Sequence, residues 1–425
     1  IERSLRFNSA DSAYLNRTFA AGNRTKWTWS GWVKRSVLGT NRQHIFGNTT
    51  SGSGPFGSIE FNSDKLNYYD NGLSASTQVF LTTRVFRDTS AWYHIVIALD
   101  TSQSTDATRI KVWVNGVQET TFDSISVQAS SSGYLNDAAQ HNIGSWTPAA
   151  GYYLDAYLAD VHFIDGQALA PTDFGKFDSN NVWQAKNYLD TYGTNGFHLD
   201  FADNSSVSAL GTDTSGNSNN FTPNNFSVTA GVGNDSLVDT PTNYGSDTGA
   251  GGEVRGNYAT FNPLTNYNRN GASGGGGAFK QGNLVVYGAT TAETDISLTM
   301  KIPTSGKYYL EITYTAAPAG AGDPYIWVYP NGNLDAGGRI TAHRPTNGQL
   351  VGLAFDRDTN NLYVYVNNVL TTTITTMDVS LEYNVGVYDY FQTNWTYTLN
   401  SGQRPFTYTA PSGYKALCTQ NLPDP

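Results

Sequence analysis

The sequence predicts an all-β protein made of two tandem antiparallel β-sandwich domains, and three observations support this fold class. At 425 residues, the chain is longer than a single hydrophobic core usually serves. Only 14% of the residues are charged, and the 43 Gly with many Ser, Thr and Asn supply polarity and turns instead. Short segments with alternating apolar residues recur along the chain, whereas no amphipathic helix longer than a couple of turns is evident.

The first half of the chain contains clear strand and hairpin patterns. Residues 27–33 and 110–114 alternate large apolar residues with small or polar ones, which is typical of a half-buried strand. The second run ends at Asn115-Gly116, which favours a tight hairpin because both residue types accept positive φ angles. Residues 93–99 form a nearly continuous apolar run, which predicts a fully buried strand.

A change of composition separates the two halves. Residues 225–254 are dominated by Gly, Asn, Ser and Thr, which predicts a connector between a domain at 1–224 and a domain at 255–425. Strand patterns resume after Gly282, and a hairpin is predicted to turn at residues 358–361. The second domain is therefore also expected to be a β-sandwich, followed by a C-terminal tail.

Charge and cysteine content narrow the partners that we expect. The net charge of −10 argues against nucleic acid, because neutralising phosphates requires clustered Lys and Arg. No apolar run approaches 18 residues, so no membrane insertion is expected. Cys418 is the sole cysteine, which excludes an internal disulfide and a cysteine-based metal site.

Several segments resemble known families. Four segments of the first half resemble the laminin-G-like, concanavalin-type jelly roll. They are WTWSGWVKR (27–35), WYHIVIALD (92–100), IKVWVNGV (110–117) and YLDAYLADVHFIDGQALAPTDF (153–174). Segment 196–222 is similar to a closing edge strand of that fold. In the second half, a SPRY domain is resembled by SGKYYLEITY (305–314), QLVGLAFDRDTNNLYVYVNN (349–368) and YNVGVYDY (383–390), with 401–417 similar to its last strand and tail.

This pairing of domains resembles tail-fibre and other virion surface proteins of marine bacterial viruses. The resemblance implies a protein on the virion exterior, a tail fibre or receptor-binding protein that attaches to host cell-surface carbohydrate or protein. It also implies contacts with other virion proteins and a homo-oligomer, with a trimer favoured. The alternative is a structural capsid or tail decoration protein that contacts only virion neighbours.

No enzymatic activity and no catalytic residue are expected. Glycosidases need two carboxylates at defined separations, and glucanases of the jelly-roll type carry a Glu-x-Asp-x-Glu strand. The nearest pattern here is Glu293-Thr294-Asp295, which lacks the closing Glu and lies outside the first domain. The six histidines form no close pair in the sequence, and no Gly-x-Ser-x-Gly nucleophile motif is present.

Oxygen-bearing side chains near residue 200 suggest one possible cofactor, a structural calcium ion. Many laminin-G-like domains carry a calcium ion at the rim, and calcium prefers carboxylate and amide oxygens. The candidate ligands are Asp200, Asp203, Asp213 and Asn217. The alternative is that these residues form turns by bonding to their own backbone.

Aromatic residues in loop-like segments are the candidates for ligand binding. Sugars are held by exposed aromatic faces flanked by polar groups, and Tyr and Trp offer large contact area at low entropic cost. The candidates are Tyr69, Trp146, Tyr152 and Tyr153. Trp146 is expected to be exposed because turn-forming residues 147–151 follow it. We therefore expect loops on a rigid scaffold to recognise the ligand, with several copies acting together.

Overall fold

The computed structural model describes most of the chain and divides it into two compact units. The described residues are 1–39, 42–49, 54–146, 151–179, 181–229, 233–242, 256–265, 277–288, 294–316, 324–330, 338–389 and 394–423. The first unit comprises Ile1–Val228 with Thr240–Thr242, and the second comprises Thr229–Asp239 with Asn243–Pro425. Half of the predicted connector, 230–232 and 243–254, lies outside the described residues, as do 147–150 and Glu293.

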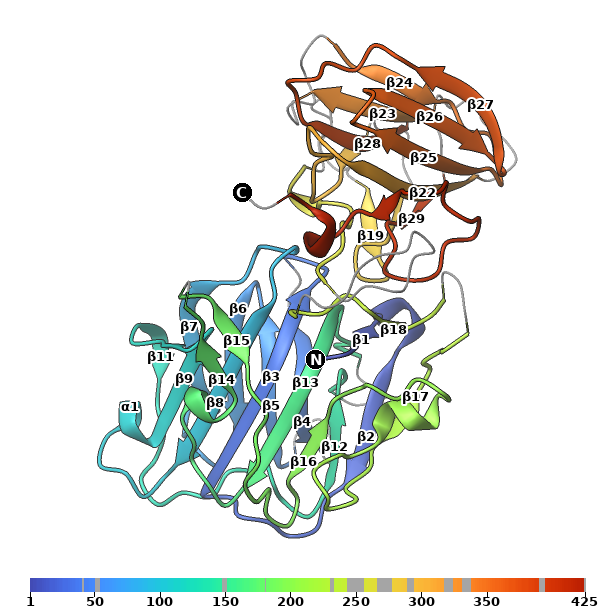
Figure 1. Cartoon of the computed structure of the whole chain (residues 1–425). Coiled ribbons are helices and arrows are strands. Elements are labelled where there is room, and N and C mark those ends of the chain that lie inside the picture. Colours follow the sequence, from blue (N-terminus) through green and yellow to red (C-terminus); the bar gives the residue numbers. More distant parts are fainter. Residues whose placement is uncertain are drawn as a thin grey trace. The chain divides into compact units, whose positions relative to one another are not determined.

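One sheet of the first unit, called here the β3 sheet, is antiparallel and has β3 near its centre (Figure 1). Its order is β10-β9-β8-β3-β13-β1, and β16 also pairs with β13. The strands are β10 (Val117–Gln118), β9 (Ile110–Val114), β8 (Tyr93–Asp100), β3 (Lys26–Arg35), β13 (Ala156–Asp165), β1 (Ser4–Phe7) and β16 (Phe197–Leu199).

The other sheet of the first unit, called here the β5 sheet, contains eight antiparallel strands in the order β11-β7-β6-β5-β4-β12-β2-β17. The strands are β11 (Phe122–Ile125), β7 (Gln78–Val85), β6 (Lys65–Asp70), β5 (Phe56–Asn62), β4 (Gln43–Thr49), β12 (Gln140–Ile143), β2 (Tyr14–Thr18) and β17 (Thr222–Asn224). A separate hairpin pairs β14 (Gly175–Phe177) with β15 (Trp183–Ala185), and the only α-helix of the described residues, α1 (Asp106–Arg109), has four residues.

The core of the first unit lies between these two sheets. Trp27 and Trp29 of β3 and Ile59 and Phe61 of β5 alternate with outward residues and are essentially fully buried in one cluster. Each such side chain contributes roughly 1.5–3 kcal/mol through removal of apolar area from water. The period of two read from residues 27–33 thus corresponds to one face in the core. The outer face of the β3 sheet carries polar groups and a smaller apolar cluster that includes Val96, Trp113 and Ile164.

The second unit contains two further sheets around its own core. The larger sheet has the order β19-β20-β29-β22-β25-β26-β27, and β30 pairs in parallel with β22. Its strands are β19 (Ala278–Lys280), β20 (Val285–Gly288), β29 (Trp395–Asn400), β22 (Lys307–Ala316), β25 (Leu350–Asp356), β26 (Asn361–Val366), β27 (Val369–Ile374) and β30 (Lys415–Ala416). The smaller has the order β21-β28-β23-β24: β21 (Thr294–Ser297), β28 (Tyr383–Asp389), β23 (Tyr325–Pro330) and β24 (Ile340–His343). Segment Thr229–Asp239 adds β18 (Ser236–Leu237).

The predicted fold class and both hairpins are confirmed. Asn115 and Gly116 connect β9 to β10 with φ angles of 49° and 78°, as the tight hairpin requires. β25 and β26 pair as predicted, and Asn360 in their turn has a φ angle of 58°. Within the described residues, no helix is long and apolar enough to cross a bilayer.

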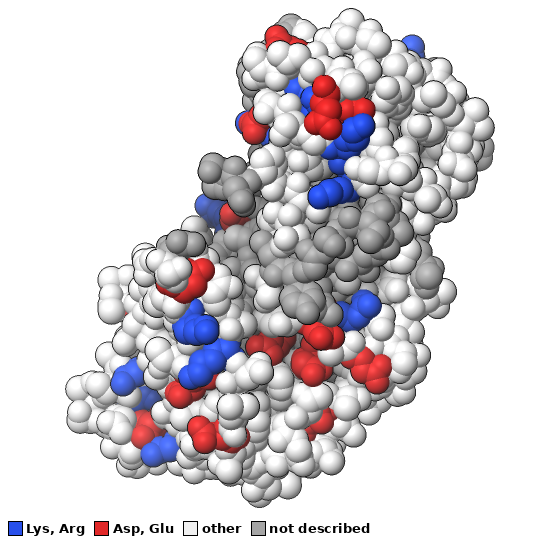
Figure 2. All heavy atoms as spheres, in the orientation of Figure 1, with Lys and Arg blue, Asp and Glu red and all other residues white. Residues whose placement is uncertain are grey.

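The surface is sparsely charged. In the view of Figure 2, Lys and Arg side chains alternate with Asp and Glu in small mixed groups, and most of the visible surface of both units carries neither sign. A continuous basic field of the kind that nucleic acid requires is not visible on the described part of this face.

Candidate functional site

The outer face of the β5 sheet carries a row of hydrogen-bonded polar side chains. Ile59 and Phe61 of β5 point into the core, so Glu60 between them faces outward. Asn67, its register partner on β6, donates to Glu60 through Nδ2 (3.2 Å to Oε1). Gln78 of β7 in turn donates to Asn67 (Nε2 to Oδ1, 3.0 Å). The row therefore links three neighbouring strands on the face opposite the core.

Arg42, which immediately precedes β4, joins this row and is surrounded by aromatic rings. Its guanidinium donates to both carboxylate oxygens of Glu60, with Nε to Oε1 at 2.9 Å and Nη2 to Oε2 at 2.6 Å. Its Cζ atom lies 4.6 Å from the ring centre of Trp146, 4.9 Å from that of Tyr152 and 5.2 Å from that of Tyr69. We call these five residues the Arg42 cluster.

The electrostatics of the Arg42 cluster are those of a partly buried ion pair. Burial is the largest single influence on the pKa of the Arg42 guanidinium, and it lowers this pKa. The hydrogen bonds to Glu60 and the charge of Glu60 together have a greater opposite effect, so the pKa is raised. Burial raises the pKa of the Glu60 carboxyl, and Arg42 opposes that rise. The Glu60 side chain is fully buried whereas the Arg42 side chain is 24% exposed, so the cation is the member of the pair that solvent and ligands can reach.

Three of the four predicted ligand-binding aromatics meet in this cluster, but their exposure differs from expectation. Tyr152 is 43% exposed, whereas Trp146, expected to be exposed, is only 8% exposed. The Trp146 ring packs against Phe56 and His44 at centroid distances of 5.2 and 5.8 Å. The His44 amide also donates to the Tyr152 carbonyl (3.0 Å), which holds this segment on the sheet. Trp146 is therefore the buried ring of the cluster, and Tyr152 is the ring most exposed to solvent.

Tyr153 does not join the Arg42 cluster. Its ring lies 6.4 Å from the ring of Tyr14 on β2, further along the same sheet. Tyr152 has a φ angle of 57°, a left-handed conformation that turns the chain between the two tyrosines. Residue type alone could not separate Tyr152 from Tyr153, because the difference arises from this turn.

The Arg42 cluster combines the groups that saccharide recognition uses. Tyr152 offers an accessible ring face, and Arg42 presents Nη1, which donates no hydrogen bond to any described residue. Guanidinium groups bind carboxylates and hydroxyl oxygens, while aromatic rings pack against apolar sugar faces. The ion pair with Glu60 and the surrounding rings keep the guanidinium in one orientation, which lowers the entropy lost on binding.

The residues missed in the sequence are Arg42 and Glu60. They are 18 positions apart, and only the pairing of β4 with β5, which aligns His44 with Glu60, brings them together. One local signal existed: a glutamate between the apolar Ile59 and Phe61 must face outward if the strand alternates.

The four predicted calcium ligands occupy turns after β16. The Asp213 carboxylate accepts hydrogen bonds from the amides of His198 (2.8 Å), Ser215 (2.9 Å) and Asn219 (2.7 Å). Asn217 donates through Nδ2 to the carbonyls of residues 193 and 196, and Asp200 and Asp203 each accept from an amide two residues ahead. Among the described residues, these carboxylates are not gathered into a group with metal-ligand spacing. The calcium site stays a prediction.

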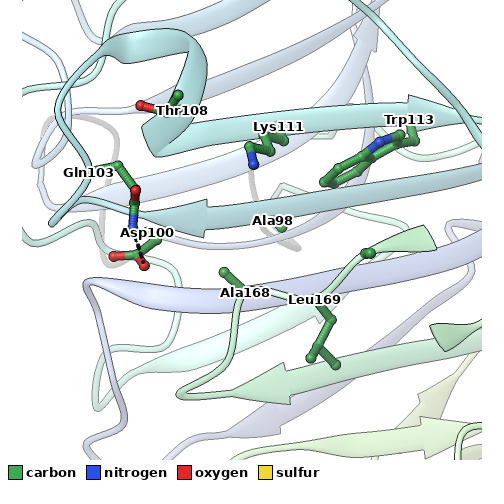
Figure 3. A pocket seen from close by; sticks show the side chains of 9 residues that line it. Ala98, Asp100, Gln103, Thr108, Lys111, Trp113, Ala168 and Leu169 are labelled. Carbon is green, nitrogen blue, oxygen red and sulfur yellow. Dashed lines mark hydrogen bonds between the residues drawn. The ribbon is translucent and has the colours of Figure 1, made fainter. Parts of the chain in front are cut away.

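A hollow lies on the outer face of the β3 sheet, in the first unit (Figure 3). Lys111 and Trp113 of β9 line it together with Asp100 of β8. Asp100 is already engaged by Lys26 (3.0 Å), and Trp113 is only 9% exposed. This hollow therefore offers less exposed aromatic surface than the Arg42 cluster, in which Tyr152 is 43% exposed.

One carboxylate of the Glu293-Thr294-Asp295 pattern is buried on the face of β21 opposite the core residue Ile296. Asp295 of β21 is fully buried and accepts a hydrogen bond from the Tyr329 hydroxyl, while Glu293 lies outside the described residues. A carboxylate buried in this way is not open to a substrate.

Comparison with known proteins identifies the fold of the first unit. Residues 7–173 match the family described as the concanavalin A-like lectin/glucanases superfamily. The first unit accordingly has a concanavalin A-like lectin fold. No curated protein matches the sequence.

Three solved structures illustrate the more distant likenesses. The SPRY domain of human HERC1 is 12% identical, with a TM-score of 0.24, covering 29% of this chain and 90% of that one. A Bacteroides ovatus protein to which carbohydrate binding is attributed is 12% identical, with a TM-score of 0.37, covering 53% and 58%. The SAP-like pentraxin of Limulus polyphemus is 17% identical, with a TM-score of 0.29, covering 40% and 78%. At TM-scores this low, these structures carry no argument about what this chain binds.

Proposed function

We propose that this chain is a non-enzymatic glycan-binding protein that uses the Arg42 cluster as its binding site. The observation that carries the proposal is the convergence of Tyr69, Trp146 and Tyr152 on one accessible guanidinium. A saccharide packs its apolar face on Tyr152 and accepts a hydrogen bond from Arg42 Nη1. The lectin fold of the first unit supports this function.

The cation makes acidic saccharides the favoured ligands. Glu60 neutralises Arg42 in charge, but the carboxylate is buried beneath the guanidinium and its oxygens are already hydrogen-bonded. A ligand carboxylate or sulfate that approaches from solvent therefore meets the donor groups of Arg42 before it meets Glu60.

The biological setting that we propose is the exterior of a bacteriophage particle, where the chain acts in a tail fibre or receptor-binding protein. This setting rests on the sequence resemblance of the domain pair to virion surface proteins. A single shallow site of this kind binds weakly, and a homo-oligomer, with a trimer favoured, raises the overall affinity because several sites engage one cell surface.

The test is binding of the purified full chain to an array of acidic and neutral glycans and to intact bacterial cells. We expect Tyr152→Ala and Arg42→Met to reduce binding at least tenfold. The matched control is Phe177→Ala on β14, because Phe177 is 45% exposed, close to the 43% of Tyr152, and lies outside the Arg42 cluster.

Each outcome decides between two functions. Saturable binding that Tyr152→Ala abolishes and Phe177→Ala preserves supports the proposal. Equal binding by the wild type and Tyr152→Ala refutes the site. No binding to any glycan or cell, together with assembly of the chain onto virus particles, would instead mean a structural decoration protein.

A further inference from the structure

A second polar cluster lies on the outer face of the β3 sheet. Asp160 and His162 belong to β13, and His198 belongs to β16. His162 and His198 are direct partners in the register of these strands, and their rings stack at a centroid distance of 4.0 Å with an interplanar angle of 10°. The histidines are not closely spaced in the sequence, but strand pairing brings together these two residues, which are 36 positions apart.

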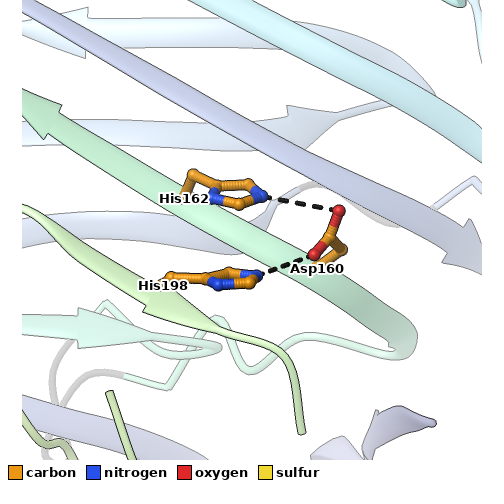
Figure 4. A group of neighbouring side chains, drawn as sticks. All are labelled: Asp160, His162 and His198. Atoms are coloured by element: carbon orange, nitrogen blue, oxygen red, sulfur yellow. Dashed lines mark hydrogen bonds and ion pairs between the residues drawn. The ribbon is translucent and has the colours of Figure 1, made fainter. Parts of the chain in front are cut away.

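The two imidazoles direct their Nε2 atoms at one carboxylate (Figure 4). His198 Nε2 lies 2.7 Å from Asp160 Oδ1, and His162 Nε2 lies 3.4 Å from Asp160 Oδ2. Potential ligand atoms of the three residues all lie within 4.8 Å of one another, and theirs is the only such group among the described residues. In a tetrahedral zinc site with bonds of about 2.0–2.1 Å, neighbouring ligand atoms are about 3.4 Å apart. Because a metal lies in the plane of each imidazole that binds it, binding would require the two stacked rings to tilt towards a common point as well as an opening of the Asp160–His198 contact.

The opposite nitrogen of each ring is held by a hydroxyl group. His162 Nδ1 lies 3.0 Å from the Tyr192 hydroxyl, and His198 Nδ1 lies 3.0 Å from Thr214 Oγ1. Both hydroxyls can accept an Nδ1 proton, which is the arrangement that metal binding through Nε2 requires. The hydrogen bond of His198 Nε2 to Asp160 means that this nitrogen carries a proton, which the metal would displace. His162 is 1% exposed, and its Nε2 makes no hydrogen bond. Buried polar atoms are normally hydrogen-bonded. This buried nitrogen, which faces the other two potential metal ligands without a hydrogen bond, therefore indicates a metal site and not only a hydrogen-bond network.

The cluster is open on one side. Asp160 and His198 line a cleft of the first unit, and Asp200, Gln184 and Asn187 are among the other residues that line it. The carboxylate of Asp200 adds negative charge, which favours a cation at the end of the cleft. Because the protein surrounds the cluster on only part of its circumference, the cleft can supply a further ligand from solvent.

We propose that Asp160, His162 and His198 form a divalent transition-metal site of the zinc class, with an exchangeable position that faces this cleft. Imidazole nitrogen with one carboxylate suits Zn²⁺ and its neighbours, whereas Ca²⁺ requires six to eight oxygen ligands. The metal would join β16 to β13, and a water molecule or an oxygen atom of a bound molecule would occupy the open position. The site is independent of the Arg42 cluster, which lies on the other sheet.

The test uses the full, untagged chain, because a histidine tag would itself bind the metal. Zn²⁺ is titrated by calorimetry after chelator treatment, Co²⁺ is titrated by visible absorption, and Ca²⁺ is the competitor. We expect one Zn²⁺ per chain, and absorption bands of four- or five-coordinate Co²⁺. His162→Gln and His198→Gln should each lower Zn²⁺ affinity at least tenfold, and Tyr192→Phe roughly tenfold through loss of the hydroxyl that orients His162.

His343→Gln is the matched control, because His343 belongs to the second unit and hydrogen-bonds to Gln349. This variant should bind Zn²⁺ as the wild type does. Circular dichroism verifies that each variant folds, and Tyr192→Phe, which removes only one oxygen, serves if the histidine variants do not. No saturable Zn²⁺ binding by the wild type, unchanged affinity in folded His162→Gln and His198→Gln, or binding of Ca²⁺ in preference to Zn²⁺ would each overturn the proposal. None of these results would alter the glycan test, whose variants lie in the other cluster.

Discussion

Removing Arg42 should destabilise the first unit through the carboxylate that it leaves behind. In Arg42→Met, the fully buried Glu60 retains only the neutral donors Asn67 (3.2 Å) and Ser58 (3.1 Å). A buried carboxylate that has lost its cation must remain desolvated, become protonated or pull water into the sheet. Each of these responses costs free energy that the native pair does not require.

The magnitude follows from the geometry of the pair. Breaking a buried ion pair by removing one partner costs about 3–5 kcal/mol, and the 24% exposure of Arg42 places this case at the lower end, near 3 kcal/mol. Glu60→Gln leaves the partly solvated Arg42 without its anion and should cost about 1.5 kcal/mol. The double variant Arg42→Met with Glu60→Gln leaves no uncompensated charge, and we expect it to cost about 1 kcal/mol. The coupling energy is then about 3.5 kcal/mol.

The assay is urea unfolding at neutral pH, followed by tryptophan fluorescence, because Trp146 touches Arg42 and reports on the first unit. The control is Lys65→Met, which removes the cation of the more exposed Lys65–Asp123 pair and should leave the transition unchanged. If Arg42→Met unfolds at the same urea concentration as the wild type, or if the double variant is as unstable as the sum of the single variants, the reasoning about the buried carboxylate is wrong.

Three further predictions concern stability. Burial lowers the pKa of three histidines of the first unit to about 3: His44, His94 and His141. As the pH falls below about 6.5, the unfolded chain therefore binds protons that the folded chain does not. The free energy of unfolding should fall between about pH 6.5 and 3, by roughly 1.4 kcal/mol per pH unit for each net proton. Three carboxyls oppose this effect because burial raises their pKa values: Asp70, to about 6, and also Glu60 and Asp155. The histidine pKa values fall from about 6.5 to about 3, so their effect extends across most of the range between pH 7 and pH 4.5. Urea midpoints of the first unit at these two pH values should therefore still differ, and equal midpoints would contradict the assignment. In the second unit, Gly288→Ala should cost about 1–3 kcal/mol because its Cβ would lie 2.3 Å from the Trp395 ring, whereas Gly233→Ala, with open space around it, should not shift the melting temperature. Asp213→Ala should cost about 2 kcal/mol because three backbone amides lose their acceptor, whereas Asp203→Ala at the surface should leave the melting temperature unchanged; equal effects would contradict this distinction.

The strands could be predicted from the sequence because their signals are local. Alternation in residues 27–33 and the Asn115-Gly116 turn depend only on neighbouring residues, and both correspond to the observed elements. The order of the strands in each sheet could not be predicted. Strands β5 and β6 are consecutive in the chain, whereas β13 pairs with both β3 and β1, and no local pattern encodes such distant pairings.

The candidate site was predictable by residue type but not by geometry. Tyr69, Trp146 and Tyr152 could be selected because aromatic residues in polar segments are unusual. The group on which they converge, Arg42, is indistinguishable in the sequence from any other surface arginine. The exposure of Trp146 was predicted wrongly because its burial depends on contacts with Phe56 and His44, which lie on distant strands.

Both clusters of the first unit lie where a β-bulge changes which residues face outward. On β13, Ala156 and Leu158 belong to the core before the bulge, and Val161 and Phe163 belong to it afterwards. The extra residue shifts the alternation by one, so His162, which would otherwise point into the core, faces outward.

On β4, the register with β5 shifts between His44 and Phe46, and both Ile45 and Phe46 enter the core, which leaves His44 beside Glu60 on the outer face. The polar groups of both clusters are therefore positioned chiefly by strands rather than by loops alone. Deleting Asp160 would test this inference further, because removing the extra residue restores simple alternation and should leave Val161 and Phe163 in the core and His162 on the outer face. Under the two proposals made above, recognition by this unit depends on rigid sheet faces, and mutations that alter strand register should abolish binding even where every contacting side chain is retained.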